Sequence, residues 1–423
     1  MSPGKHSASR IKQTAGRRLS VITVDQAIAG ASNVLIAVLA ARLLGVAAFG
    51  LFGIVFLVYV MVQGVARALV CDPVLVHPLE AQQRRGDVIG TSCLLGLGLG
   101  LAVLVVGLAV RIWIPELGGA LIVLAVCVPL LVLQDLGRYL GFAYQQPSSA
   151  LTLDVVWLVL QFGAVAVLAA TDTRTLAWFI AAWAGSGAAA GLLLFTQYRA
   201  GDVRFNLSWL RYTWAFSWRY LISYTSTQGA ALGASSGVGA ISGARQLGGL
   251  QGALLLVRPY ITIQVAAVAA SVSEMARLNT DHQRLRRHAT RITALTSGIA
   301  VLNTIVLVVL PDRLGRLVLG AAWEATQPLL LPTGVQIIFL GLITGARAGL
   351  LGMRAIKQVV AIDVAGTVVI LVAAIAGAVV DGAKGALWAV AAGQGLLTVV
   401  WWWTFRTSTS SPNRLSTNVA SPA

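Results

Sequence analysis

Three arginines stand in otherwise apolar stretches of this chain: Arg42, Arg67 and Arg258. An arginine near the middle of a membrane costs at least about 2.5–3.5 kcal/mol, so each of the three needs water, a cavity or a partner. Guanidinium groups bind phosphate and diphosphate through paired hydrogen bonds, so these residues favour an anionic ligand over a cationic one. We expect the three arginines to contact a substrate, together with the polar residues Asn33 and Gln63.

Each arginine also has a structural alternative. Arg42 and Arg67 map near the ends of predicted helices, from which a long side chain reaches the headgroup region. Arg258 maps about 11 residues into its helix, which places it ~16 Å deep and near the midplane. Its alternative is a pair with a buried carboxylate, but no acidic residue maps to that depth. The functional interpretation is therefore strongest for Arg258.

A second group combines carboxylates with an arginine near predicted cytoplasmic helix ends: Asp25, Asp135, Arg138 and Asp154. We consider these residues candidates for gating or ion coupling. The alternative is that the carboxylates face water or headgroups, or that they pair with Arg138. A proton relay usually needs a deeper carboxylate, so the driving ion stays open.

The sequence carries no motif for other chemistry. It has no P-loop, no large external loop and no cluster of histidines in an apolar run. The cysteines Cys71, Cys93 and Cys127 lack paired spacing and histidine companions. We expect no disulfide, no metal site, no cofactor and no catalytic residue, and therefore no enzyme.

The amino-acid composition indicates which kind of secondary structure holds these residues in place. The chain is 57% hydrophobic and 11% charged, with a mean hydropathy of +0.81. A soluble protein carries roughly 25% charged residues, whereas repeated apolar runs of ~20 residues are typical of transmembrane helices. The net charge of +16 comes mostly from short segments between apolar runs, so we expect no nucleic-acid partner.

The apolar runs predict an all-α, polytopic membrane protein of about twelve transmembrane helices. These helices are expected at 23–44, 49–69, 89–110, 119–143, 152–170, 176–197, 219–240, 247–274, 291–310, 327–349, 358–380 and 386–404. The domains are a basic cytoplasmic N-tail, an N-lobe, an interfacial linker helix, a C-lobe and a disordered C-tail, at 1–22, 23–198, 199–218, 219–404 and 405–423.

The basic residues predict the orientation. Most of the 31 lysines and arginines fall in segments that a cytoplasmic N-terminus places inside. We expect both termini in the cytoplasm and the N-tail to precede a signal anchor. In the linker, Trp209, Trp214 and Trp218 alternate with Arg211 and Arg219. This pattern predicts a helix in the membrane interface, with a lateral gate for a lipid substrate as the alternative.

A glycine-bounded turn occurs twice. Gly45–Gly50 follows the first expected helix and Gly243–Gly248 follows the seventh, at an offset of 198 residues. The repeat and the helix count together predict two pseudo-symmetric six-helix lobes around a central cavity.

Several segments carry a family resemblance. They are Asp25-Gln26, Asn33, Ala41-Arg42-Leu43-Leu44-Gly45, Phe49-Gly50-Leu51-Phe52, Arg67-Ala68-Leu69 with Pro73, Gln134-Asp135-Leu136-Gly137-Arg138-Tyr139 and Gly345-Ala346-Arg347-Ala348-Gly349. The chain resembles bacterial polysaccharide flippases of the multidrug/oligosaccharidyl-lipid/polysaccharide exporter superfamily. The length and the twelve-span layout agree with that family.

The resemblance implies a transporter in the bacterial plasma membrane. Its substrate would be an undecaprenyl-diphosphate-linked saccharide, moved to the outer leaflet by alternating access, with Arg67 and Arg258 on the diphosphate. The family's usual ion-coupling carboxylate on the seventh helix is not evident here. The expected partners are the lipid-linked saccharide and membrane lipids, with a polysaccharide polymerase or ligase as further candidates. The alternatives are a multidrug or small-molecule antiporter of the same superfamily and a membrane-embedded saccharide ligase or polymerase.

Overall fold

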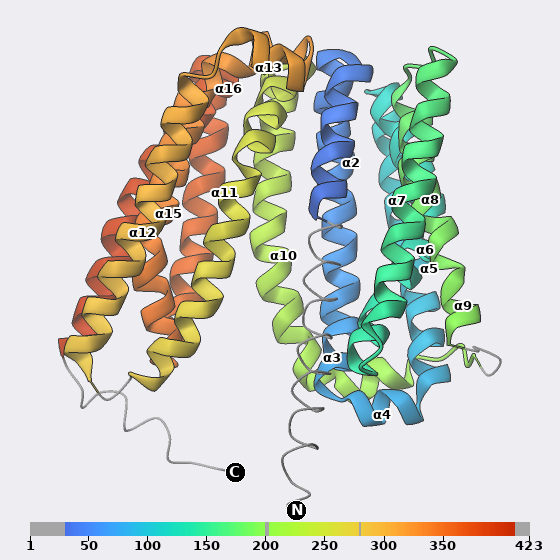
Figure 1. Cartoon of the computed structure of the whole chain (residues 1–423), viewed down its shortest axis with the longest axis horizontal. Helices are drawn as coiled ribbons and strands as arrows, with labels where there is room; N and C mark the ends of the chain where they lie inside the picture. The colour runs from blue at the N-terminus through green and yellow to red at the C-terminus, as the bar shows by residue number, and fades with distance from the viewer. Residues whose placement is uncertain (1–29, 199–202, 279–280, 411–423) are drawn as a thin grey trace, which may run out of the picture. The chain divides into compact units, whose positions relative to one another are not determined.

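A computed structural model of the chain describes residues 30–198, 203–278 and 281–410, and the regular structure within these ranges is helical (Figure 1). Two compact units divide the chain, Met1–Gln228 and Gly229–Ala423. The expected N-tail (1–22) and Asp25 lie outside the described residues.

The first unit contains the helix Gly30–Leu43 and nine labelled elements with part of a tenth. They are α2 (Gly45–Ala66), η1 (Arg67–Cys71), α3 (Asp72–Val76), α4 (Pro78–Gln83), α5 (Arg85–Arg111), α6 (Pro115–Ala143), α7 (Pro147–Ala170), α8 (Leu176–Gly191), α9 (Leu193–Gln197) and the first part of α10 (Ser208–Ser242).

The second unit contains the rest of α10 and seven further elements. They are α11 (Ala244–Arg277), α12 (His282–Val308), α13 (Asp312–Leu319), α14 (Ala322–Thr326), η2 (Gln327–Leu329), α15 (Leu330–Gly352) and α16 (Ile356–Ser410). The short helices α13 and α14 fall in a stretch expected to be a loop.

The all-α, polytopic fold is confirmed. Within the described residues, nine helices are long and apolar enough to cross a membrane. One of them, α16, is broken at Asp381 and Gly382, whose backbone is not helical, so it holds the two helices expected at 358–380 and 386–404. The helix Gly30–Leu43 is apolar but shorter. The count of twelve stays a prediction.

The two glycine turns are tighter than expected. Gly45 is the first residue of α2 and Gly243 directly precedes α11, so the residues after each glycine are already helical. Their φ angles are 76° and 84°, in the left-handed region that favours glycine. No atom lies within 4 Å of a Cβ built on either residue, so backbone conformation and not space selects glycine there. This equivalence supports the internal repeat.

The first unit ends later than the expected N-lobe (23–198). Its boundary falls at Gln228, inside α10 and ten residues into the expected C-lobe (219–404). The reason lies in the segment assigned to the linker (199–218). Trp209 is fully buried and its indole N–H donates to the carbonyl of Val70 at 3.4 Å. The described part of the linker is thus the packed beginning of α10 and not a separate helix.

The expected C-tail (405–423) needs a correction at its start. Helix α16 continues to Ser410, with Phe405 fully buried and Thr409 almost so. The guanidinium of Arg286 on α12 donates to the hydroxyls of Thr409 and Ser410, both at 2.8 Å. Apolar packing and these bonds keep residues 405–410 helical, although their Ser/Thr content suggested disorder.

We predict that Gly45→Ala or Gly243→Ala lowers the free energy of unfolding by about 1–2 kcal/mol, because an L-residue is strained in the left-handed region. Unfolding in detergent, followed by intrinsic fluorescence against a denaturant series, measures the change.

Gly98→Ala on α5 is the matched control. A Cβ at Gly98 also meets no atom within 4 Å, but the residue lies inside a helix. This variant is expected to be neutral or stabilising by up to about 1 kcal/mol. Equal losses in all three variants would contradict the role assigned to the positive φ angles.

Candidate functional site

Five residues singled out from the sequence line one cavity in the first unit: Asn33, Gln63, Arg67, Arg138 and Asp154. The cavity has a volume of about 130 Å³ and lies among the Gly30–Leu43 helix, α2, η1, α6, α7 and α10. Its remaining walls are mostly aromatic and are formed by Ser32, Phe56, Tyr59, Val60, Trp157 and Tyr224.

Helical periodicity explains how α2 and η1 together line one side of the cavity. Tyr59, Gln63 and Arg67 follow one another at intervals of four residues, so they share one face of the helix. On α7, Asp154 and Trp157 share a face in the same way, three residues apart. The rest of α2 is strongly apolar, so these polar groups can only face the protein interior.

Arg67 makes the shortest ion pair at the site. Its Nε lies 2.6 Å from Oδ2 of Asp135 and its Nη2 lies 2.9 Å from Oδ1, a bidentate arrangement. The Asp135 side chain is 2% exposed and that of Arg67 is 38% exposed. A buried carboxylate therefore fixes the orientation of the guanidinium, while part of the Arg67 side chain stays exposed.

Arg138 connects the two buried carboxylates. Its Nη1 lies 3.5 Å from Asp135 and its Nε lies 3.1 Å from Asp154. Asp154 also accepts a hydrogen bond of 3.1 Å from the amide of Gln134. Two arginines and two aspartates thus form one network across η1, α6 and α7, with formal charges that cancel.

This network decides between the alternatives for the carboxylates. Asp135 and Asp154 are 1% and 6% exposed, so they do not face solvent. They pair with Arg138, the alternative that the sequence left open. The expected substrate contact of Arg67 stays a prediction, and the structure adds that the charge of Arg67 is partly compensated by Asp135.

A change of helical register starts at Arg67. Helix α2 passes into one turn of π-helix over Arg67–Cys71, and the backbone N–H of Asp72 bonds to the carbonyl of Arg67. Pro73 has no N–H to offer the carbonyl of Leu69 four residues earlier, and this carbonyl accepts instead from the hydroxyl of Ser217 at 3.5 Å. Such π-turns occur frequently at functional sites.

Two polar residues beside the network tie helices together. The amide of Gln63 donates to the carbonyl of Leu131 on α6 at 3.2 Å. Its own carbonyl oxygen is buried and has no hydrogen-bond partner among the described residues. Gln161 on α7 donates to the hydroxyl of Ser32, which joins α7 to the Gly30–Leu43 helix.

The other sequence candidates lie apart from this cavity. Arg42 is exposed at the far end of α2 from Arg67, as an interfacial anchor would be. Arg258 is half-buried near the middle of α11 and belongs to the second unit.

Sequence reasoning missed the aromatic walls. Tyr59 packs on the buried Trp183 of α8, with ring centroids 4.9 Å apart, and Trp157 donates its N–H to the carbonyl of Trp183 at 3.0 Å. The hydroxyl of Tyr224 on α10 donates to the carbonyl of Val60 at 2.8 Å. Spacing along α2 and α7 could have indicated Tyr59 and Trp157, but no local signal indicates Tyr224.

The second unit repeats one of the ion pairs. Arg347 on α15 lies 2.9 Å from Asp363 on α16, and the two are 16 residues apart. Arg138 and Asp154 are separated by the same interval, at an offset of 209 residues. In both units the pair joins consecutive long helices, which is a second trace of the internal repeat beside the glycine turns.

Residues 38–328, more than half of the chain, match the family described as "Polysaccharide biosynthesis protein". No curated protein matches the chain.

Solved structures share the fold at low identity. An inward-facing multidrug resistance MATE family transporter of the MOP superfamily is 14% identical, with a TM-score of 0.73 over 92% of this chain and 96% of its own. The lipid II flippase MurJ, in an inward closed conformation, is 11% identical, with a TM-score of 0.69 over 91% and 87%. A MOP superfamily transporter from Pyrococcus furiosus is 14% identical, with a TM-score of 0.55 over 93% of each chain. The chain is therefore a multi-pass membrane protein with the fold of these proteins.

We predict that Asp135→Asn lowers the free energy of unfolding by about 3 kcal/mol. This value is at the lower end for a broken buried ion pair because Arg67 is partly exposed. Adding Arg67→Gln should recover part of the loss, and a double-mutant cycle of detergent unfolding measures the coupling.

Asp172→Asn is the control, since Asp172 forms an exposed ion pair with Arg174 at 2.7 Å. It should change stability by less than about 1 kcal/mol. A coupling between Arg67 and Asp135 no larger than this would contradict the network as a stabilising element.

Proposed function

This chain belongs to the family of polysaccharide biosynthesis proteins, and we propose that it is a flippase for a lipid-linked saccharide, not an enzyme. The proposed substrate is an undecaprenyl-diphosphate-linked saccharide. It is moved across the bacterial plasma membrane by alternating access, with both termini of the protein in the cytoplasm. A polysaccharide polymerase or ligase would then act on the exported product.

One observation carries the proposal: a polar cavity among apolar helices is lined by Arg67, whose guanidinium is fixed in orientation and whose side chain is partly exposed. Asp135 holds Arg67 by two bonds, so binding a phosphate does not require ordering of the side chain. The N–H groups that do not face Asp135 remain for a ligand. A diphosphate is the part of the substrate that this geometry suits.

The size of the cavity limits what enters it. A volume of about 130 Å³ is well below the ~300–1,000 Å³ of sites that enclose whole ligands. We infer that one charged group of the substrate reaches Arg67 while the saccharide stays outside the cavity. The free carbonyl oxygen of Gln63 and the amide of Asn33 are suited to neighbouring hydroxyls or water.

We propose that Arg258, in the second unit, is also an anion contact. Near the middle of a long apolar helix, an arginine is costly unless it serves a ligand or a partner. Arg42 is assigned a minor role as an anchor at the membrane surface.

Asp135 and Asp154 are proposed to position Arg67 and Arg138. A carboxylate that couples transport to protons must exchange its proton during the cycle. Because each carboxylate contacts an arginine, that exchange would require the arginine to move away. Ion coupling through this network therefore means opening the Arg67–Asp135 pair or the Arg138–Asp154 pair.

The test uses the purified full-length protein in vesicles with a fluorescent diphosphate-lipid oligosaccharide in the inner leaflet. Leaflet accessibility to an external quencher reports transfer. Arg67→Gln should slow transfer about tenfold or more, the effect of losing one charge-assisted hydrogen bond. Arg258→Gln is expected to act in the same direction.

Arg174→Gln is the control, because Arg174 is exposed and pairs only with the exposed Asp172 among the described residues. It should transfer substrate at the rate of the unchanged protein. Absence of transfer in the unchanged protein, together with proton flux driven by a cationic drug, would instead indicate a multidrug antiporter.

A further inference from the structure

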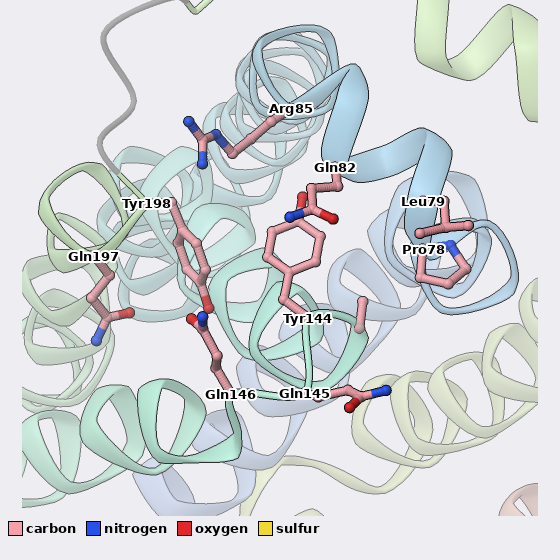
Figure 2. Close-up of a pocket in the computed structure, with 10 residues that line it drawn as sticks. Pro78, Leu79, Gln82, Arg85, Tyr144, Gln145, Gln146, Gln197 and Tyr198 are labelled. Carbon is pink, nitrogen blue, oxygen red and sulfur yellow. The ribbon is translucent and has the colours of Figure 1, made fainter.

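A second and larger pocket opens at one end of the first unit, with a volume of about 430 Å³ (Figure 2). It shares no lining residue with the cavity at Arg67. Its polar walls come from one arginine, two tyrosines and several glutamines, among them Arg85, Tyr144, Tyr198, Gln82, Gln146 and Gln197.

The pocket lies where membrane spans begin and end. Spans start at Arg85 and Pro147, and others end at Ala143 and Gln197. All four positions line the pocket or directly adjoin it. The pocket is therefore at the depth of lipid headgroups, at the end of the unit that the basic residues predict to be cytoplasmic.

The lip of the pocket is apolar. Pro78 and Leu79 line it, and Leu79 is 70% exposed. In a membrane, apolar acyl chains lie directly beside polar headgroups, so a lipid could place its acyl chains on the apolar rim and its headgroup against the polar walls.

Hydrogen-bonding capacity within the pocket is partly used and partly free. The hydroxyl of Tyr144 donates to the carbonyl of Ala81 at 3.2 Å, and that of Tyr198 donates to the carbonyl of Gly137 at 2.9 Å. These bonds fix the two rings, whose centroids are 6.0 Å apart, as walls. Burial raises the pKa of both phenols to about 12, so the walls stay uncharged at neutral pH.

Gln197 provides a buried acceptor. Its amide nitrogen donates to the carbonyl of Ser149 at 3.3 Å, which fixes the orientation of the side chain. Its carbonyl oxygen is buried and has no hydrogen-bond partner among the described residues. A ligand hydroxyl could donate to this oxygen, and the amides of Gln82 and Gln146 could serve neighbouring hydroxyls.

Arg85 provides the charge. In the part of the chain that the structure describes, no carboxylate forms an ion pair with Arg85 and no acidic residue lines the pocket. A ligand group beside Arg85 should therefore be anionic. A second cation, such as the ammonium of a zwitterionic headgroup, would have no carboxylate to compensate it.

We propose that this pocket binds the headgroup of an anionic, hydroxylated glycerophospholipid, with the phosphate on Arg85 and the polyol hydroxyls on the glutamine side chains. The aromatic walls enclose the polyol, and the acyl chains lie on the apolar rim formed by Pro78 and Leu79. The pocket volume is within the range of ligand sites. Bound in this way, the lipid would connect α4, α5, α6 and α9.

The test is native mass spectrometry of the full-length protein in detergent, titrated with short-chain phosphatidylglycerol. Arg85→Gln should weaken binding about tenfold or more, through loss of the charge-assisted bond. Arg84→Gln is the matched control, because Arg84 neighbours Arg85 but contacts the ring of Tyr212 and does not line the pocket. It should change binding less than about twofold.

A second matched pair avoids the arginines. Gln82 and Gln83 are adjacent and exposed, but only Gln82 lines the pocket. Gln82→Glu introduces a negative charge of nearly equal shape and should weaken phosphatidylglycerol binding, whereas Gln83→Glu should leave it within about twofold.

Three outcomes would overturn the proposal. Equal losses of phosphatidylglycerol binding within either matched pair would show that the lipid responds to the overall surface charge and not to this pocket. Equal binding of phosphatidylcholine would remove the case for an anionic headgroup. Equally tight binding of soluble glycerol phosphate would show that the pocket takes a free polyol phosphate and not a lipid.

Discussion

The cost of holding charge among apolar helices is the constraint on which the first unit depends. Arg67, Asp135, Arg138 and Asp154 lie in a strongly apolar bundle, and each would be destabilising without the others. Their ion pairs connect η1, α6 and α7 to one another. The same contacts fix the orientation of the Arg67 guanidinium, and the Arg67 side chain stays partly exposed. The ion pairs that stabilise the fold therefore also orient a residue of the candidate site.

The backbone next to this network serves two purposes. The π-turn at Arg67–Cys71 shifts the register of the chain where Arg67 meets Asp135. With Pro73 it leaves backbone carbonyls that α10 contacts through Trp209 and Ser217. The segment that positions the arginine therefore also attaches the start of α10, which explains why this helix belongs in part to the first unit.

The internal repeat survives in backbone geometry and in charge pairing more than in sequence. Gly45 and Gly243 keep the same left-handed conformation, which few other residues adopt without strain. The pairs Arg138–Asp154 and Arg347–Asp363 keep the same interval of 16 residues. The two units are not equivalent, however. In the first unit a second arginine joins the pair and extends it into a network beside a cavity, whereas Arg347 and Asp363 are both partly exposed.

Sequence by itself determined the features that depend on local physics. Low charge and long apolar runs predicted a polytopic helical protein, two glycines marked the tight turns, and residue type selected five of the residues that line one cavity. The tertiary structure decided which groups are partners. Arg67 and Asp135 are 68 residues apart, and periodicity shows which residues share a helix face but not which helix packs against that face. Such non-local contacts compensate the charge of Arg67, bury Asp154 and pack Trp209. The sequence alone does not show them, because the free energy of a buried charge or ring depends on its neighbours in space.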